Sequence, residues 1–292
     1  ITDGKPVGTN LYHSFAQFSV GTGDIAQFQT TTLVPNTTLS NILGRVTGGS
    51  PSSIFGTVDS STYYPNANLF LMNPNGILFG PGAQINVGGM AHFTTADYLR
   101  LAGNVRFEAV PGAQDALLST ASVAAFGFLG SNPTAIAVQG SQFTLANGTG
   151  LSLVGGNQGF NYTNPDTGLK AAVPDGMTMT GGRLSAPGGQ INLASVASAG
   201  EVLNGTLEPA PNINGNSFTA MGNISLSQGT TLTVSGNAAG TVRIRGGQFV
   251  IADATISANT VNGNAAQTAI DIKLTGDLLI SDTRALPALT AR

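Results

Sequence analysis

The sequence predicts an all-β fold, a parallel β-helix assembled from many very short strands. The apolar runs that could form strands are only three to five residues long and are separated by tight turns. Gly accounts for 40 residues, whereas only 9% of residues are charged, against about 25% in an average protein. Similar segments recur at Leu232 and Ile256, and the spacing between them lies within the repeat lengths of solenoid proteins.

The first group of predicted strands lies in the first third of the chain. Apolar residues fill 69–72 and 77–79, the short segment 85–87 reads Ile-Asn-Val, and Asn, Pro and Gly stand between these segments. Gly and Asn supply the positive φ angles that tight turns require. Three such short strands in one stretch leave no room for hairpins of ordinary length.

The second half of the chain repeats this pattern. Apolar and polar residues alternate over short stretches, which is typical of half-buried strands. An antiparallel sandwich would need longer strands with more even spacing, so the β-helix is favoured over this competing architecture. With ~22 residues per coil and ~4.8 Å between coils, the chain would make on the order of 10 coils in a rod of roughly 50 Å. The predicted strands are 189–193, 222–226, 231–234, 240–244, 249–251, 254–256 and 270–274.

Two stretches outside these strands are interpreted from their composition. Residues 95–101 fit either a helical turn or a strand. Residues 155–179 contain many Asn, Pro and Gly and are predicted to form a long surface excursion. No linker divides the chain, so we expect a single domain over residues 1–292.

Charge and composition exclude several functions. The net charge is -3, and Lys plus Arg total only 11 without a basic run, whereas nucleic-acid binding needs a concentrated positive patch. Attraction to an anionic membrane surface is disfavoured for the same reason. No apolar run reaches the roughly 18 residues that span a bilayer. The chain has no Cys, which excludes disulfides and suits a protein that crosses an oxidising compartment unfolded.

Residues suited to catalysis or metal binding are sparse. The two histidines, His13 and His92, have no partner at a metal-binding spacing, and both are interpreted as structural or surface residues. The 14 acidic residues are scattered, and Asp271, Asp277 and Asp282 are interpreted as solvated turn positions. We therefore expect no catalytic residue, no metal, no cofactor and no enzyme activity.

An alternative class of function is an extracellular β-helix that binds or cleaves carbohydrate. Cleavage would need clustered carboxylates, for a calcium site or an acid and base pair. Binding would need an aromatic platform, and the chain has no Trp and only five Tyr. This alternative stays open at the level of residue types.

One turn is more specific than the others. Asn73, Pro74, Asn75, Gly76 and Ile77 follow an apolar run. Pro presets φ at the second position of a turn, and Asn tolerates the third. Gly76 accommodates left-handed geometry, and Asn73 is able to cap the turn with its side chain. From physical chemistry alone, the simplest interpretation is a good turn between two buried strands.

The residues around this turn resemble a known family. Residues 68–80 are similar to the signature of the filamentous-haemagglutinin-type N-terminal domain, the secretion (TPS) domain of two-partner secretion exoproteins of the TpsA family. The family's additional Asn-Pro-Asn-Leu motif is absent, since the nearest stretch is Val-Pro-Asn-Thr at 34–37. Further blocks that resemble the family are 10–15, 18–20, 41–49, 53–56, 82–89, 93–97, 188–196 and 200–202.

The resemblance implies a fold with a defined N-terminal end. It implies a right-handed parallel β-helix with an N-terminal cap and short extra-helical strands or loops. We assign residues 1–30 to the cap region and 31–292 to the coils. The cap is also expected physically, because a bare strand edge would aggregate. The cap candidates are Tyr12, Phe15 and Phe18.

The resemblance also implies a function in secretion. The domain would direct a large exoprotein, adhesin or haemagglutinin-like, to an outer-membrane transporter of the Omp85/TpsB type through the periplasmic POTRA domains of that transporter. The β-helix would then nucleate folding outside a Gram-negative cell. Residues 73–77 would hold a coil turn and contact the transporter.

Expectations about the rest of the protein follow from the same resemblance. The rest of the exoprotein would contact a host or surface glycan or protein, and we expect a monomer. The chain starts at Ile1 without a Met, so we expect that a leading segment such as a signal peptide has been removed. We also expect the natural chain to continue past Arg292.

Overall fold

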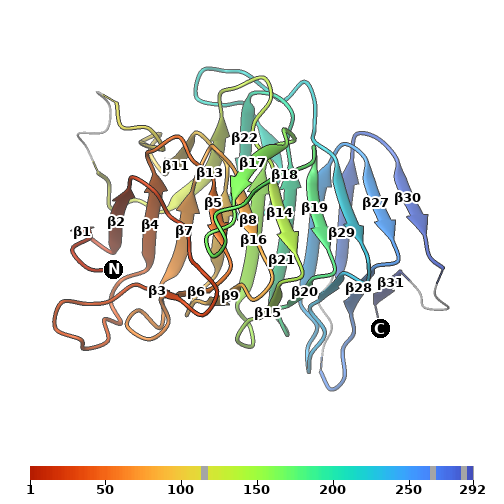
Figure 1. The fold of residues 1–292 in the computed structure, drawn as a ribbon, viewed down its shortest axis with the longest axis horizontal. Coiled ribbons are helices and arrows are strands. Elements are labelled where there is room, and N and C mark those ends of the chain that lie inside the picture. Colours follow the sequence, from red (N-terminus) through yellow and green to blue (C-terminus); the bar gives the residue numbers. More distant parts are fainter. Residues whose placement is uncertain (113–117, 264–267, 284–287, 292) are drawn as a thin grey trace.

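The computed structural model describes residues 1–112, 118–263, 268–283 and 288–291. These residues form a long stack of short β-strands, with the N-terminus at one end and the C-terminus at the other (Figure 1). No helix occurs among the residues described. The all-β prediction is confirmed.

The first face of the stack is a nine-stranded sheet. All its neighbours pair in parallel except β1 and β2, which are antiparallel. The strands, in sheet order, are β1 (Lys5–Val7), β2 (Asn10–Phe15), β4 (Asn41–Val46), β7 (Asn68–Met72), β10 (Ala91–Thr94), β16 (Gly150–Gly155), β21 (Gln190–Ser195), β26 (Thr241–Gly246) and β29 (Ile270–Leu274).

Two further faces complete each coil. The second face consists of β5 (Ser52–Ile54), β8 (Ile77–Phe79), β14 (Ile136–Gln139), β19 (Met177–Thr180), β24 (Ile224–Ser227), β27 (Phe249–Ala252) and β30 (Leu278–Ser281). The third face begins with β3 (Ile25–Gln27), β6 (Thr57–Asp59) and β9 (Gln84–Asn86) and continues with β15 (Gln142–Thr144), β20 (Arg183–Ser185), β25 (Thr231–Thr233), β28 (Thr255–Ala258) and β31 (Leu289–Ala291).

Strand register confirms the parallel β-helix and excludes the antiparallel sandwich. Leu232 pairs directly with Ile256 in parallel, as their spacing in the sequence predicts. The coil from Leu69 to Ala91 has the expected length of ~22 residues. The next coil, from Ala91 to Leu151, is far longer, because the chain leaves the stack and returns. Such departures leave fewer coils than the roughly ten expected.

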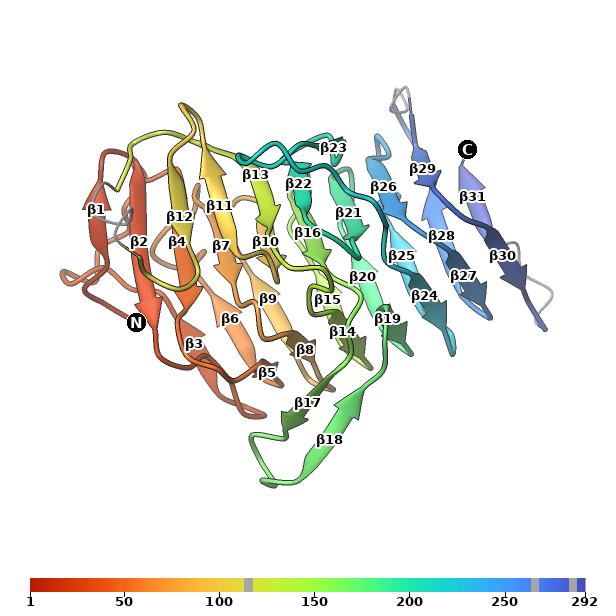
Figure 2. The same cartoon turned by 90° about the horizontal axis from the view of Figure 1, so that it is seen from above.

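The longest departures build a second layer outside the first face. This extra-helical sheet has five antiparallel strands and lies alongside the first face (Figure 2). Residues 95–101, which fit either a helical turn or a strand, contribute a strand here. The strands are β12 (Arg106–Glu108), β11 (Tyr98–Leu101), β13 (Val123–Phe128), β22 (Gly200–Leu203) and β23 (Pro209–Ala210).

A separate antiparallel hairpin projects from the second face. It consists of β17 (Phe160–Thr163) and β18 (Lys170–Val173) and extends away from the stack (Figure 2). It lies within the stretch 155–179 that composition marks as an excursion. The tip of the hairpin contacts a loop of the N-terminal region. There the Asp166 carboxylate accepts hydrogen bonds from the Thr22 N–H at 2.8 Å and from the Thr22 hydroxyl at 2.7 Å.

Apolar side chains separate into three clusters. The largest fills the inside of the coils and consists of Leu, Ile, Val and Phe side chains stacked along the axis. A second lies between the first face and the extra-helical sheet, and includes Phe70 and Phe126. A third lies under the hairpin, where Phe160 packs against buried Phe55 and Leu78. Burial of apolar area at ~25 cal/mol per Å² is the main stabilising contribution in each.

Candidate functional site

The motif turn, residues 73–77, joins β7 on the first face to β8 on the second. Asn73 is fully buried, whereas Pro74 and Asn75 are half-buried. The Gly76 N–H donates to the Asn73 carbonyl at 3.2 Å, which closes a four-residue β-turn with Pro at its second position. The Asn73 side-chain oxygen accepts from the Asn75 N–H at 3.0 Å, so Asn73 caps the turn.

Asn73 connects its own coil to the coils on both sides. Its Nδ2 donates to the Ser50 carbonyl and to Ser52 Oγ, each at 3.0 Å, in the preceding coil. Its backbone N–H donates to the Thr94 carbonyl at 2.9 Å in the next coil. Because these groups are shielded from water, loss of the Asn73 side chain would leave buried polar atoms without partners.

Asn75 makes a second link to the preceding coil. Its Nδ2 donates to the Gly48 carbonyl at 2.8 Å and to Asn73 Oδ1 at 3.0 Å. Together with Pro74, its side chain is the part of the motif turn that reaches the surface. The turn therefore has a buried anchor and a partly exposed tip.

The hairpin covers the last residues of the motif turn. Gly76 has a φ of 114°, and a Cβ at this position would lie 2.8 Å from the Phe160 ring. Glycine is required here for its backbone conformation and for the close approach of an aromatic ring. Ile77 points into the core and is fully buried.

Tyr12 lies on the outward side of β2, toward the extra-helical layer. It is 4% exposed, and its hydroxyl donates to the Ser119 carbonyl at 2.6 Å. Its ring lies edge-on to Phe107, with ring centroids 5.0 Å apart. Burial raises the pKa of the Tyr12 hydroxyl.

Phe15 and Phe18 lie on the inward side, at the N-terminal end of the coil interior. Their ring centroids are 5.2 Å apart, and Phe15 also lies edge-on to Phe28 at 6.3 Å. The structure therefore brings Phe15 and Phe18 together and places Tyr12 on the opposite face of the same strand. Beyond them, β1 pairs with the outer edge of β2.

The two histidines are both buried and lie in different layers. His13 stacks on Phe15 inside the first coil, at 5.8 Å, and burial lowers its pKa to about 4. His92 stacks on Phe70 beneath the extra-helical sheet, at 4.1 Å, and burial lowers its pKa to about 3. Both are uncharged near neutral pH, as structural residues would be.

A ladder of Asn side chains, which the sequence analysis missed, runs across the first coils. Asn41 Nδ2 donates to Asn10 Oδ1 at 2.9 Å, and Asn68 Nδ2 donates to Asn41 Oδ1 at 3.1 Å. Asn68 Oδ1 then accepts from the Met90 N–H at 2.8 Å. The available signal was an Asn followed by an aliphatic residue at the start of each strand.

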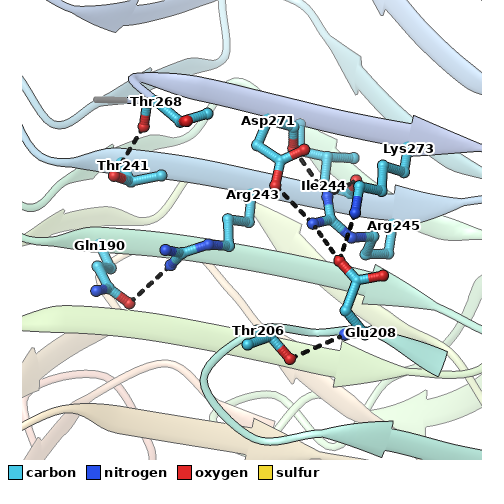
Figure 3. Close-up of polar contacts among 10 residues, drawn as sticks. All are labelled: Gln190, Thr206, Glu208, Thr241, Arg243, Ile244, Arg245, Thr268, Asp271 and Lys273. Atoms are coloured by element: carbon cyan, nitrogen blue, oxygen red, sulfur yellow. Dashed lines mark hydrogen bonds and ion pairs between the residues drawn. The ribbon is translucent and has the colours of Figure 1, made fainter. Parts of the chain in front are cut away.

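An ion-pair cluster joins the extra-helical layer to the last coils (Figure 3). The side chain of Arg245 is only 2% exposed and contacts Asp271 at 2.6 Å and Glu208 at 3.1 Å. Lys273 contacts the same Glu208 oxygen at 2.6 Å. Hydrogen bonds from Arg245 and Lys273 hold the pKa values of Asp271 and Glu208 below their usual ranges. The interpretation of Asp271 as a solvated turn position was wrong, because it lies in β29 and pairs with a buried guanidinium.

The hydrogen bonds and ion pairs described above hold neighbouring coils and layers together. Within the described part of the chain, no three His, Asp or Glu side chains come together as ligands for a metal ion. The described residues also contain no helix that is long and apolar enough to cross a membrane. The buried Asn side chains of the motif turn and the ladder connect successive coils, and the Arg245 cluster joins the second layer to the first.

The fold and the motif turn define a class, the β-helical secretion domains. A family model described as TPS secretion domain matches residues 1–244, and the chain belongs to this family. Domains of this family target an exoprotein for two-partner secretion, and they are targeting domains without catalysis. Membership implies a secreted exoprotein of Gram-negative bacteria and a TpsB transporter as its partner.

One solved structure agrees with the fold, and a second shows a weaker likeness. The filamentous hemagglutinin secretion domain is 15% identical, with a TM-score of 0.50, over 97% of this chain and 88% of that one. The HMW1 secretion domain from Haemophilus influenzae is 17% identical, with a TM-score of 0.39, over 96% of this chain and 81% of that one. No curated protein matches.

Proposed function

We propose that the motif turn is a contact for the transporter and that its buried part starts the folding of the β-helix. The observation that supports this is the division within the turn. Asn73, Gly76 and Ile77 are withdrawn from the tip, with Asn73 and Ile77 fully buried and Gly76 under the Phe160 ring, whereas Pro74 and Asn75 are half-buried at the surface. A recognition role would belong to the half-buried pair at the surface and a folding role to the buried anchor.

The proposed partner surface is the periplasmic POTRA region of the TpsB transporter. Residues 1–292 would act as one secretion domain, with a cap in residues 1–30 around Phe15, Phe18 and Tyr12 and coils in 31–292. The finished exoprotein would be displayed or released at the cell surface as an adhesin or haemagglutinin-like protein. A strand edge at the end of each finished coil would template the next, so folding would propagate from the first coils.

The test is Asn75→Ala, compared with Asn147→Ala, which removes an exposed Asn before Gly in another turn. We expect Asn75→Ala to lower secretion with the co-expressed transporter and to weaken capture of the domain by purified POTRA domains. The control should do neither. Thermal unfolding of the purified variants separates the two roles of the turn.

Two outcomes would contradict recognition. Normal secretion of a folded Asn75→Ala protein would remove the contact role. Loss of folding in the purified variant, with capture by the POTRA domains reduced only as far as the folded fraction is reduced, would support a purely structural turn. Family membership stands in either case, because it does not depend on this residue.

A further inference from the structure

Asn75 and Gly76 in the motif turn are one of five Asn-Gly pairs in the chain. An Asn side chain that precedes Gly is open to attack by the next backbone nitrogen, because Gly has no Cβ to block the approach and the greatest backbone freedom. Each such pair is therefore a candidate for a covalent change that needs no enzyme. The other four pairs are 147–148, 204–205, 214–215 and 262–263.

The reaction joins two groups that are neighbours along the chain. The Gly76 nitrogen, after loss of its proton, adds to Asn75 Cγ, and the carboxamide nitrogen leaves as ammonia, which closes a five-membered succinimide ring. Water then adds to one of the two ring carbonyls and opens the ring. The product at position 75 is aspartate or isoaspartate. The rate depends on how often the nitrogen and Cγ come within about 3–3.5 Å of each other in the right orientation.

The folded turn holds both reacting groups away from this geometry. Asn75 Nδ2 donates to the Gly48 carbonyl at 2.8 Å and to Asn73 Oδ1 at 3.0 Å, so the carboxamide is fixed toward the preceding coil. The Gly76 N–H donates to the Asn73 carbonyl at 3.2 Å. Gly76 is buried, and the Phe160 ring lies 2.8 Å from where a Cβ would stand. The backbone rotation that attack requires would break these contacts.

We propose that Asn75 is a site of spontaneous deamidation that is open in the unfolded chain and closed by the folded turn. Either product damages the turn. An aspartate carboxylate only accepts hydrogen bonds, so it would face two acceptors, the Gly48 carbonyl and Asn73 Oδ1. Isoaspartate adds an atom to the backbone and moves the Gly76 N–H away from the Asn73 carbonyl.

The consequence is a limit on the time that the chain remains competent to fold. A chain kept unfolded would lose the coil-to-coil links of Asn75, whereas a chain that folds promptly would keep them. The fold would thus protect the motif turn from a change that the amino-acid sequence itself makes easy. This inference concerns folding and does not depend on contact with the transporter.

Peptide mapping by mass spectrometry tests the site, with Asn147 as a reference in the same chain. The Gly148 N–H also donates, to the Pro187 carbonyl at 2.8 Å. The Asn147 side chain, however, is exposed, and no hydrogen bond holds it within the described part of the chain. In urea we expect similar conversion at both sites. In the folded protein we expect conversion at Asn75 to be at least about tenfold slower than at Asn147, because attack then requires local opening of the turn.

A refolding experiment on the unmodified chain tests the consequence without a variant. The chain is held in urea at mildly alkaline pH for increasing times and then diluted to a urea concentration just below its unfolding midpoint. Size-exclusion chromatography separates folded from unfolded molecules, and both pools are mapped. We expect aspartate and isoaspartate at position 75 to collect in the unfolded pool, with conversion at Asn147 equal in the two pools.

Two results would overturn the proposal. One is conversion at Asn75 that is as fast in the folded protein as in urea, since the turn would then give no protection. The other is an equal share of converted position 75 in the folded and unfolded pools, since the modification would then leave folding unaffected.

Discussion

Hydrogen bonds from individual Asn side chains link neighbouring coils, in addition to the backbone hydrogen bonds between paired strands. Asn73 satisfies groups in the coil before it, and the Asn10, Asn41 and Asn68 ladder does so across three successive coils. Amide side chains suit this task because they donate and accept at once. They add directional contacts between coils without adding charge to a nearly uncharged chain.

Gly76 is the residue at which substitution should be most revealing. Gly76→Ala places a methyl group 2.8 Å from the Phe160 ring on a backbone with φ of 114°. We expect a loss of about 1–3 kcal/mol in the free energy of unfolding, measured by urea denaturation. Most of this loss should come from weaker packing of the hairpin, through Phe160, over the motif turn.

Two controls separate backbone strain from collision. Gly23 has a φ of 82° and no heavy atom near a new methyl group, so Gly23→Ala reports strain alone. Phe160→Ala should remove the collision, so Gly76→Ala should cost less in that background. Equal costs in both backgrounds would show that the ring contact is irrelevant.

At the scale of elements, the strands are short and gain stability from neighbours. Strands of three to six residues pair on both sides within the parallel faces, except the strands at the ends of each sheet. The extra-helical strands differ, since β13 pairs with β22, which lies two coils further along the chain. The second layer is therefore complete only when distant segments have come together, and the Arg245 cluster connects it to β26 and β29.

Arg245→Met should loosen this connection. The change removes a buried cation, which leaves Asp271 without this ion pair and Glu208 with Lys273 alone, and both carboxylates are partly exposed. We expect a loss of roughly 1–3 kcal/mol, below the usual cost of breaking a fully buried pair. Hydrogen exchange should rise in β22 and β23 more than in the early coils.

The matched control is Arg243→Met on the same strand, whose guanidinium bonds to Gln190 at 3.1 Å. It removes one charge and a similar side-chain volume. We expect a smaller loss of stability and no change in β22 or β23. Equal effects from the two variants would mean that net charge, and not the cluster, determines stability.

At the scale of the whole molecule, the two buried histidines should make stability depend on pH. Burial lowers the pKa from 6.5 to about 4 in His13 and about 3 in His92. The unfolded chain takes up protons below about pH 6.5 while the folded chain does not, so stability is full above that pH and falls as pH decreases. Each histidine contributes a slope of about 1.4 kcal/mol per pH unit at most.

Denaturation at pH values of about 7.5, 6.5 and 5.5 measures this slope. Asp97, whose pKa is raised by burial, acts in the opposite direction, because its folded form holds a proton more tightly than its unfolded form. His92→Gln should reduce the slope by about the share of one histidine. A stability independent of pH over this window would show that neither histidine is kept uncharged by the fold.

The sequence predicted the repeating part of the molecule because each coil carries its own local signal. Short alternating runs, turn residues and the spacing between Leu232 and Ile256 placed many of the strands, among them β7, β8, β25 and β28. The motif turn was located for the same reason, since Asn, Pro and Gly each determine their own backbone geometry. Residues 155–179 stood out by composition, although nothing local indicates a hairpin.

The sequence by itself therefore determined a parallel β-helix of short strands, its turns and its membership in a secretion family. Only the tertiary structure decided what covers it. The extra-helical sheet pairs segments that are far apart in sequence, and its buried side chains, among them Phe126, pack against outward-facing residues of the first face such as Phe70 and His92. No local pattern encodes such contacts, because the free energy that fixes them comes from burial between layers and not from the preferences of single residues.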